Sequence, residues 1–260
     1  MGDYKNTLRK AIQRFGIDVV RYPLASPPAR MVKLLHHHNV DCVVDVGANS
    51  GGFATTIRRL GYADRIISFE PLQRPYESLR KKASADGNWE AIQLAIGDIQ
   101  RDVTINVSGN AGLSSSILPM LDSHVNAAPK SRYVGAESVR QDQLDNLLPA
   151  LGAAPRCRTF LKVDVQGYER SVLTGASRLL AERAIVGLQL ELSLVPLYEG
   201  AMTYREGLDL ADSLGMTIMG LDPVFADPTT GQLLQADAVF FSRDPCKSVT
   251  DEPQTESGSS

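Results

Sequence analysis

The stretch Val-Val-Asp-Val-Gly-Ala-Asn-Ser-Gly-Gly, residues 43 to 52, decides the fold class of this 260-residue chain. An apolar run that ends in an acid and a glycine-rich turn is typical of a buried parallel strand whose carboxyl end opens toward a ligand. Gly47 and Gly51 remove Cβ atoms where the backbone turns sharply, and Asp45 provides a carboxylate at the strand end. Because such crevices hold nucleotides in open α/β sheets, the stretch predicts a nucleotide-like ligand.

Composition and charge narrow the classes of partner and compartment. With 43% hydrophobic residues, the chain can fill the core of one sizeable α/β domain. A net charge of −3 and a pI near 5.8 provide no basic field for a nucleic acid, so we expect a small or neutral substrate. Three cysteines without metal-ligand spacing indicate a reducing compartment, and we expect a cytoplasmic protein. No apolar run approaches the ~18 residues that a membrane span needs.

The chain is expected to form one domain with additional segments at both ends. We predict a helical extension over residues 1–39, a single α/β domain over residues 40–243 and a disordered polar tail over residues 244–260. Residues 3–15 carry an apolar stripe that is typical of an amphipathic helix, formed by Leu8, Ile12 and Phe15. We expect this helix to pack on the domain edge, and peripheral contact with a membrane surface is the alternative.

From Asp41 onward, apolar runs alternate with helical patterns, which indicates parallel strands joined by crossover helices. The predicted core strands are residues 43–46, 65–69, 90–96, 159–163 and 184–192. The predicted helices are residues 27–39, 53–60, 74–85, 144–151, 168–175, 178–183 and 204–214.

Two segments with period-two alternation lie outside this pattern. Residues 102–107 and 131–139 are predicted as edge strands. The segment between them, residues 108–130, is rich in Ser, Gly, Asn and Pro and lacks periodicity. A loop of this length usually covers a substrate or is disordered.

Acidic side chains stand at the ends of four core strands: Asp45, Glu70, Asp98 and Asp164. Because the carboxyl ends of parallel strands lie side by side, these carboxylates should converge at one edge of the sheet. Glu70 follows Gly51 by roughly 20 positions, the separation that places an acid on ribose hydroxyls. Asp98, after Gly97, is placed to accept a hydrogen bond from an adenine amino group. The pattern predicts an adenosine-shaped site.

Two cofactors share an adenosine half, a dinucleotide and S-adenosylmethionine. The glycines stand at Gly47, Gly51 and Gly52, a spacing that does not match the fingerprint in which helix amides cradle a pyrophosphate. A carboxylate at Asp45 would repel a diphosphate and attract the cationic groups of S-adenosylmethionine. Residues 216–221 and 236–242 predict a C-terminal antiparallel hairpin, which dinucleotide-binding sheets usually lack and methyltransferase-type sheets have. The residues therefore favour S-adenosylmethionine.

Six motifs are spread along residues 40 to 243. They are Val-Asp-Val-Gly-Ala-Asn-Ser-Gly in the 43 to 51 region, Phe69-Glu70-Pro71, Ala95-Ile96-Gly97-Asp98, Leu113-Ser114-Ser115-Ser116, Leu161 to Glu169, and Pro196 to Gly200. Together they resemble the FkbM-type S-adenosylmethionine-dependent methyltransferases. The resemblance implies a Rossmann-like class I methyltransferase fold, with a seven-stranded, mostly parallel sheet, a C-terminal antiparallel hairpin and helices on both faces. It also implies O-methylation of a sugar hydroxyl in a glycolipid, polysaccharide or glycosylated secondary metabolite.

Methyl transfer to an alcohol needs a group that takes the hydroxyl proton. Asp164 is the leading candidate because the following Gln166-Gly167 turn leaves room for a substrate, and capping the next helix is its alternative role. Glu191, at the end of the fifth strand, is the candidate for a carboxylate pair with Asp164, and a structural salt bridge is its alternative. His124, in the long loop, is a third candidate base, and a solvated histidine is the alternative.

The expected cofactor contacts come from the strand ends and the long loop: Asp45, Gly47, Asn49, Gly51, Phe53, Glu70, Pro71, Gly97, Asp98, Ser115 and Asp164. We predict S-adenosylmethionine as cofactor, and Asp164 with Glu191 as the ligands of Mg²⁺ if a metal takes part. The expected substrate is a small molecule or a glycan. Two alternatives to an O-methyltransferase remain open: a nicotinamide-dependent oxidoreductase and a non-catalytic protein that binds an adenosyl cofactor.

Overall fold

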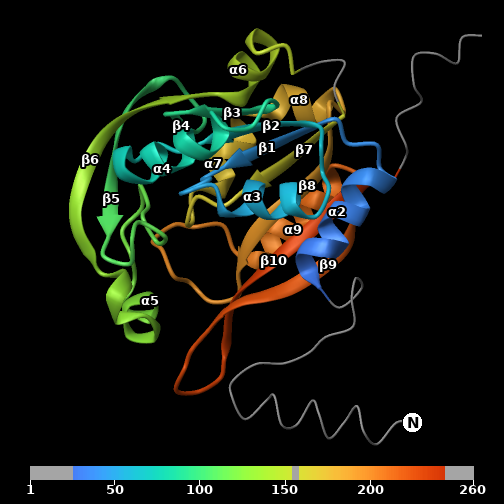
Figure 1. The fold of residues 1–260 in the computed structure, drawn as a ribbon. Helices are drawn as coiled ribbons and strands as arrows, with labels where there is room; N and C mark the ends of the chain where they lie inside the picture. The colour runs from blue at the N-terminus through green and yellow to red at the C-terminus, as the bar shows by residue number, and fades with distance from the viewer. Residues whose placement is uncertain (1–25, 154–157, 244–260) are drawn as a thin grey trace, which may run out of the picture.

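The computed structural model describes residues 26–153 and 158–243 (Figure 1). The predicted helix over residues 3–15 and the predicted tail over residues 244–260 lie outside the described residues. The first described helix is α2, Pro27–His37, which carries prolines in its first turn, where their missing N–H groups cost nothing. This helix confirms the prediction made from the Pro27-Pro28 pair.

Seven strands of the described residues form one sheet in the order β3-β2-β1-β7-β8-β10-β9. Strands β3, β2, β1, β7 and β8 run parallel, and β10 runs antiparallel to both β8 and β9. The bounds are β1 Cys42–Val46, β2 Arg65–Phe69, β3 Trp89–Ile92, β7 Thr159–Val163, β8 Ile185–Ser193, β9 Met216–Ala226 and β10 Leu233–Ser242. The predicted mostly parallel sheet with a C-terminal antiparallel hairpin is confirmed.

Helices cover both faces of this sheet, as predicted (Figure 1). Side chains alternate between the faces along β1, so Val43 joins the core under α2, α3 and α4, while Val44 joins the core under α6, α7, α8 and α9. Leu35 and Leu148 anchor helices in these two cores. The bounds are α3 Gly52–Arg59, α4 Gln73–Ala83, α6 Leu144–Ala150, α7 Glu169–Thr174, α8 Ser177–Ala181 and α9 Tyr204–Ser213.

Three further strands form a separate sheet in the order β4-β6-β5, with bounds β4 Ala95–Ile96, β5 Arg101–Ser108 and β6 Tyr133–Asp142. The prediction of one strand over residues 90–96 is wrong, because its first part pairs with β2 and its last two residues pair with β6. Strand β6 lies between β4 and β5, but β4 pairs only with the last two residues of β6. Residues 133–139 therefore pair with β5 alone, which confirms the predicted edge strand over most of residues 131–139. The predicted edge strand over residues 102–107 is confirmed as β5.

The segment between β5 and β6 contains secondary structure that its composition did not predict. It includes the helix α5, Asp122–Ala127, and the 3-10 turn η1, Pro129–Ser131. Isolated β-bridges join Ser116 to Asn106 of β5, and Met120 to Tyr198 beyond β8. The segment is therefore tied to both sheets.

The turn from β1 to α3 requires glycine at two positions. Gly47 has a φ of +79°, and a Cβ atom there would lie 1.9 Å from the backbone oxygen of Asp164. Gly51 has a φ of +78°, and a Cβ atom there would lie 2.9 Å from both Leu79 and Trp89. The first of these close approaches places the turn directly against the end of β7.

Candidate active site

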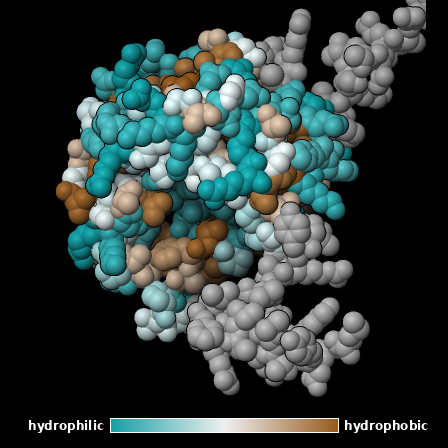
Figure 2. All heavy atoms as spheres, viewed as in Figure 1, coloured by the Kyte–Doolittle hydropathy of each residue, from teal (hydrophilic) through white to brown (hydrophobic). Residues whose placement is uncertain are grey.

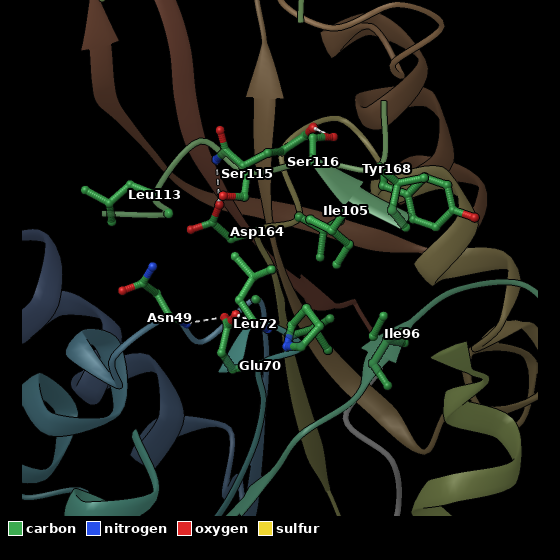
Figure 3. A pocket seen from close by; sticks show the side chains of 18 of the residues that line it. Asn49, Glu70, Leu72, Ile96, Ile105, Leu113, Ser115, Ser116, Asp164 and Tyr168 are labelled. Carbon is green, nitrogen blue, oxygen red and sulfur yellow. Dashed lines mark hydrogen bonds between the residues drawn. The ribbon is translucent and has the colours of Figure 1, made fainter. Parts of the chain in front are cut away.

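A cavity of about 690 Å³, including its open mouth, lies at the carboxyl ends of β1, β2 and β7. Figure 2 shows a hollow on the viewed face with hydrophobic residues gathered beside it, and Figure 3 shows Asp164 between Ser115 and Glu70. The predicted contacts that line the cavity are Gly47, Asn49, Glu70, Pro71, Ser115 and Asp164, and apolar lining comes from Leu72, Leu94, Ile96, Ile105 and Leu113.

Glu70 follows the last residue of β2 and presents a buried carboxylate to the cavity. The backbone N–H of Asn49 donates to Oε2 at 2.8 Å, and the N–H of Leu72 donates to Oε1 at 2.9 Å. Because each carboxylate oxygen can accept a second hydrogen bond, the side chain can still bind two ribose hydroxyls. Burial raises the pKa of Glu70 to about 7, although the two N–H donors oppose this shift.

Asp164 follows the last residue of β7, and its side chain is 35% exposed in the cavity. Lys162 Nζ lies 3.1 Å from its Oδ2, and Gln166 Nε2 donates to its Oδ1 at 2.9 Å. These contacts fix the direction of the carboxylate. The alternative role as a helix cap is wrong, because α7 begins at Glu169, with Tyr168 as the N-cap residue and no side-chain capping bond.

Asp45 is the penultimate residue of β1, but its carboxylate is fully buried and does not line the cavity, unlike the predicted cofactor contact. Its Oδ1 is 3.4 Å from Lys162 Nζ, and neither carboxylate oxygen has a hydrogen-bond partner among the described residues. Burial raises the pKa of Asp45. Burial would lower the pKa of Lys162, but Asp164, Asp45 and Asp237 outweigh it and raise that pKa. The structure therefore places Asp45 behind the cavity wall, where it holds the charged Lys162.

Glu191 lies on β8, next to β7, and is joined to Asp164 through an amide group. Gln166 Nε2 donates to both carboxylates, at 2.9 Å to Asp164 Oδ1 and at 2.8 Å to Glu191 Oε2. Gln235 Nε2 donates to the same Glu191 oxygen at 2.6 Å. Burial, followed by the charge of Asp164, raises the pKa of Glu191 well above its usual value. The two predicted catalytic carboxylates are thus brought together, with Gln166 between them.

The structure places five predicted cofactor contacts outside the cavity lining: Asp45, Gly51, Phe53, Gly97 and Asp98. The ring centroid of Phe53 lies 5.5 Å from Lys162 Nζ. The Asp98 carboxylate lies 3.9 Å from the guanidinium of Arg101. Leu94, Ala95 and Ile96 line the cavity at this end instead. They directly precede Gly97 and Asp98 in the sequence.

His124 lies on α5, is 2% exposed and does not line the cavity. Its ring packs edge to face against Tyr198, with centroids 5.2 Å apart, and also contacts Phe225. Burial lowers its pKa to about 4, so the ring is neutral near pH 7. The expectation of a solvated loop histidine is wrong, and this position offers no contact with a substrate in the cavity.

The model of the methyltransferase FkbM domain matches residues 45–218, which is more than half of the chain. The chain belongs to the FkbM methyltransferase family. This assignment makes the protein an S-adenosylmethionine-dependent methyltransferase, and it rules out the alternative of a nicotinamide-dependent oxidoreductase. No curated protein matches the chain.

This methyltransferase is similar to several solved methyltransferase structures at low sequence identity. The 1,6-didemethyltoxoflavin-N1-methyltransferase of Burkholderia thailandensis, with bound S-adenosylhomocysteine, is 14% identical with a TM-score of 0.42, covering 93% of this chain and 90% of that chain. The magnesium protoporphyrin IX methyltransferase of Synechocystis PCC 6803, with bound SAM, is 12% identical with a TM-score of 0.44, covering 93% and 98%. The precorrin-6y C5,15-methyltransferase of Geobacter metallireducens GS-15 is 12% identical with a TM-score of 0.44, covering 87% and 94%.

The residues present suit S-adenosylmethionine better than they suit a metal. Glu70 retains acceptor capacity for a diol, and Asp164 places a carboxylate in the cavity, where it would attract a cationic cofactor. Within residues 26–153 and 158–243, no group of three His, Cys, Asp or Glu side chains could hold a metal ion. The amide of Gln166 occupies the position between the carboxylates that a shared ion would need. Within those described residues, no helix has the length and hydrophobicity that a membrane span needs.

Two residues of the methyltransferase site have contacts that the sequence did not predict. Lys162 pairs with both Asp164 and Asp45, and Gln166 joins Asp164 to Glu191. The sequence does contain a signal for these residues. Residues 162, 164 and 166 are polar and alternate with apolar residues at the end of a strand, which predicts that they share one face. Gln166 has a φ of +55°, a conformation that the sequence does not reveal.

Proposed function

We propose that this methyltransferase transfers a methyl group from S-adenosylmethionine to a hydroxyl of a sugar. The observation that carries the proposal is the Asp164 carboxylate, which faces the cavity and is held by Lys162 and Gln166. An alcohol needs a base at the reacting oxygen, whereas many nitrogen nucleophiles do not. Asp164 is the carboxylate that lines this cavity together with the ribose-binding Glu70.

The cofactor side of the cavity is formed by the first three strand ends. Glu70 would accept hydrogen bonds from the ribose hydroxyls, while Leu72, Leu94 and Ile96 would contact the adenine ring. When bound, S-adenosylmethionine supplies an electrophilic methyl group whose C–S bond breaks as the acceptor oxygen bonds to carbon.

Asp164 has two functions in the proposed reaction. Its carboxylate orients the acceptor hydroxyl, and one of its oxygens takes the hydroxyl proton as the new O–C bond forms. Lys162 and Gln166 each donate to one carboxylate oxygen, which restricts rotation of the group. Each oxygen can accept a second hydrogen bond, so both remain able to receive the proton of the acceptor.

The experiment measures cofactor binding and methyl transfer separately. S-adenosylhomocysteine is titrated by calorimetry, and labelled methyl transfer is followed on a panel of glycosides. We expect Asp164→Asn to lower kcat by at least about 100-fold while the dissociation constant of S-adenosylhomocysteine changes less than threefold. Asp122→Asn, on the surface of α5, is the matched control with unchanged kinetics.

Three outcomes would contradict parts of this proposal. Turnover that survives Asp164→Asn removes Asp164 as the base. Binding of S-adenosylhomocysteine without transfer to any glycoside removes the sugar acceptor and leaves the non-catalytic or other-acceptor alternatives. Loss of transfer with a chelator, restored by Mg²⁺, would show that a metal takes part, against the amide-bridged arrangement of Asp164 and Glu191.

A further inference from the structure

A second cavity lies on the face of the main sheet that α2 and α3 cover. It encloses about 950 Å³, including its open mouth. Its walls come from both helices and from β8, β9 and β10, and Figure 1 shows these elements on one side of the molecule. The cavity lining includes Phe53 at the start of α3, Gln189 of β8 and Asp237 of β10. Strands β8, β9 and β10 contribute no residue to the lining of the first cavity.

Lys162 contacts one lining residue of each cavity, although it lines neither of them. Its ammonium group is 3.1 Å from Asp164, which lines the first cavity, and 5.5 Å from the ring centroid of Phe53, which lines the second. Phe53 and the proposed base therefore lie near the same ammonium group, which places the second cavity close to Asp164.

One wall of the second cavity is polar and already organised. Gln189 Nε2 donates to Asp237 Oδ2 at 2.9 Å, and Arg30 Nη2 donates to Asp222 Oδ1 at 2.6 Å. Each of these carboxylates keeps acceptor capacity for hydroxyl groups. Asp222 and Asp237 would repel a phosphate or carboxylate ligand. Arg30 does not offset this repulsion, because its charge is already paired with Asp222.

The other wall is apolar and includes an aromatic ring. Phe53, Met31, Leu34 and Val239 line it. A pyranose ring has hydroxyl groups at its edge and C–H groups on its faces, so it needs a polar wall and an apolar wall at the same time. A lipid chain would place hydrocarbon against the remaining acceptor capacity of Asp237 and Asp222, which costs free energy.

We propose that this second cavity is the acceptor site, and that it binds a neutral sugar ring between Phe53 and the pair Gln189 and Asp237. The inference rests on the proposed function, because it assigns a place to the sugar that the reaction would methylate. The acceptor hydroxyl then reaches Asp164 past Lys162, while the adenosyl cofactor occupies the first cavity. The sugar is recognised through uncharged hydroxyl groups.

The test introduces a large side chain at an exposed position of the second cavity. Val224 is 47% exposed on the edge strand β9 and lines the cavity, so Val224→Trp adds volume there without burying a new polar group. Ile218→Trp, at a 45% exposed position of the same strand outside the cavity, is the matched control. Thr56→Trp, on the α3 wall, is a second blocking variant if the first does not fold.

Binding is followed by saturation-transfer NMR with the methyl glycosides of glucose, mannose, rhamnose and xylose, in the presence of S-adenosylhomocysteine. Methyl transfer to the same glycosides provides KM and kcat. We expect Val224→Trp to raise the KM of the best glycoside at least tenfold and to remove its NMR signal. The affinity for S-adenosylhomocysteine should change less than twofold, and Ile218→Trp should match the unmodified protein.

The outcomes separate this inference from the function on which it rests. If the unmodified protein methylates a glycoside and Val224→Trp binds and methylates it equally well, the acceptor site is elsewhere and the proposed function stands. If the unmodified protein binds S-adenosylhomocysteine but methylates no glycoside, the proposed function fails and the inference fails with it. A charged glycoside phosphate that competes better than the neutral panel would also overturn the inference.

Discussion

Lys162 Nζ lies 3.4 Å from Oδ1 of Asp45, a carboxylate with no exposed surface and no hydrogen-bond partner among the described residues. A buried charge of this kind is held in the fold only while its counter-ion is present. The pair therefore connects the stability of the central strands with the orientation of Asp164, which contacts the same ammonium group.

Removal of the ammonium group should destabilise the protein strongly. Lys162→Met leaves Asp45 buried without a counter-ion, and we expect the free energy of unfolding to fall by about 3–5 kcal/mol in urea denaturation. The double variant Asp45→Asn with Lys162→Met should recover at least half of that loss, because the uncompensated charge is gone. Strictly additive losses in the two single variants and the double variant would contradict this coupling.

Cofactor affinity should depend on the ionisation of Glu70. Its pKa is raised to about 7 by burial, so below pH 7 the carboxyl is mostly protonated and loses capacity to accept from ribose hydroxyls. We expect the dissociation constant of S-adenosylhomocysteine, measured by calorimetry, to rise as pH falls from 8 to 6, approaching about tenfold per pH unit below 7. Glu70→Gln should bind more weakly with no such dependence. Glu77→Gln, exposed on α4, should keep the full pH dependence, and a flat profile in the unmodified protein would refute the assignment.

His124 should be dispensable for catalysis. His124→Phe replaces a buried ring whose Nδ1 lacks a hydrogen-bond partner with an apolar ring against Tyr198 and Phe225. We expect kcat within twofold of the unmodified enzyme and a free energy of unfolding higher by about 1 kcal/mol. A kcat reduced more than tenfold in a protein with normal affinity for S-adenosylhomocysteine would restore His124 as a catalytic candidate.

The approach of Gly47 to Asp164 should tolerate no side chain. Gly47→Ala combines a φ of +79° with a Cβ atom 1.9 Å from a backbone oxygen, and we expect a loss of roughly 3 kcal/mol or more in urea denaturation. Gly215→Ala, at a φ of +68° with no atom within 4 Å, should lose about 1 kcal/mol from backbone conformation alone. Equal losses at the two positions would show that the close approach relaxes without cost.

The main sheet could be predicted from sequence because its strands are buried on both faces. The apolar runs at residues 65–69 and 159–163 match β2 and β7 at both ends. The run over residues 90–96 failed for a reason that periodicity cannot detect. Its two halves have the same strand pattern, but β3 pairs with β2 while β4 pairs with β6, and the choice of partner depends on residues far away in the sequence.

The site was predictable where it depends on strand ends and not where it depends on side-chain direction. Glu70 and Asp164 line the cavity as the spacing of parallel strands predicts. Asp45 and Phe53 belong to the segment of β1 and the start of α3, but their side chains lie beside Lys162 and do not line this cavity. His124 sits in a polar segment, yet distant residues bury it. Composition describes neighbours in sequence, whereas burial depends on neighbours in space.

The second sheet has a small core of its own, formed by Leu72, Ala95, Val103 and Ile105 and separate from the two cores of the main sheet. Ile105 and the following loop line one wall of the first cavity. Mutations there can reshape that wall at little cost to the main sheet, while Asp164 remains fixed by β7. We therefore expect substitutions in the second sheet to change ligand preference while the main sheet stays folded.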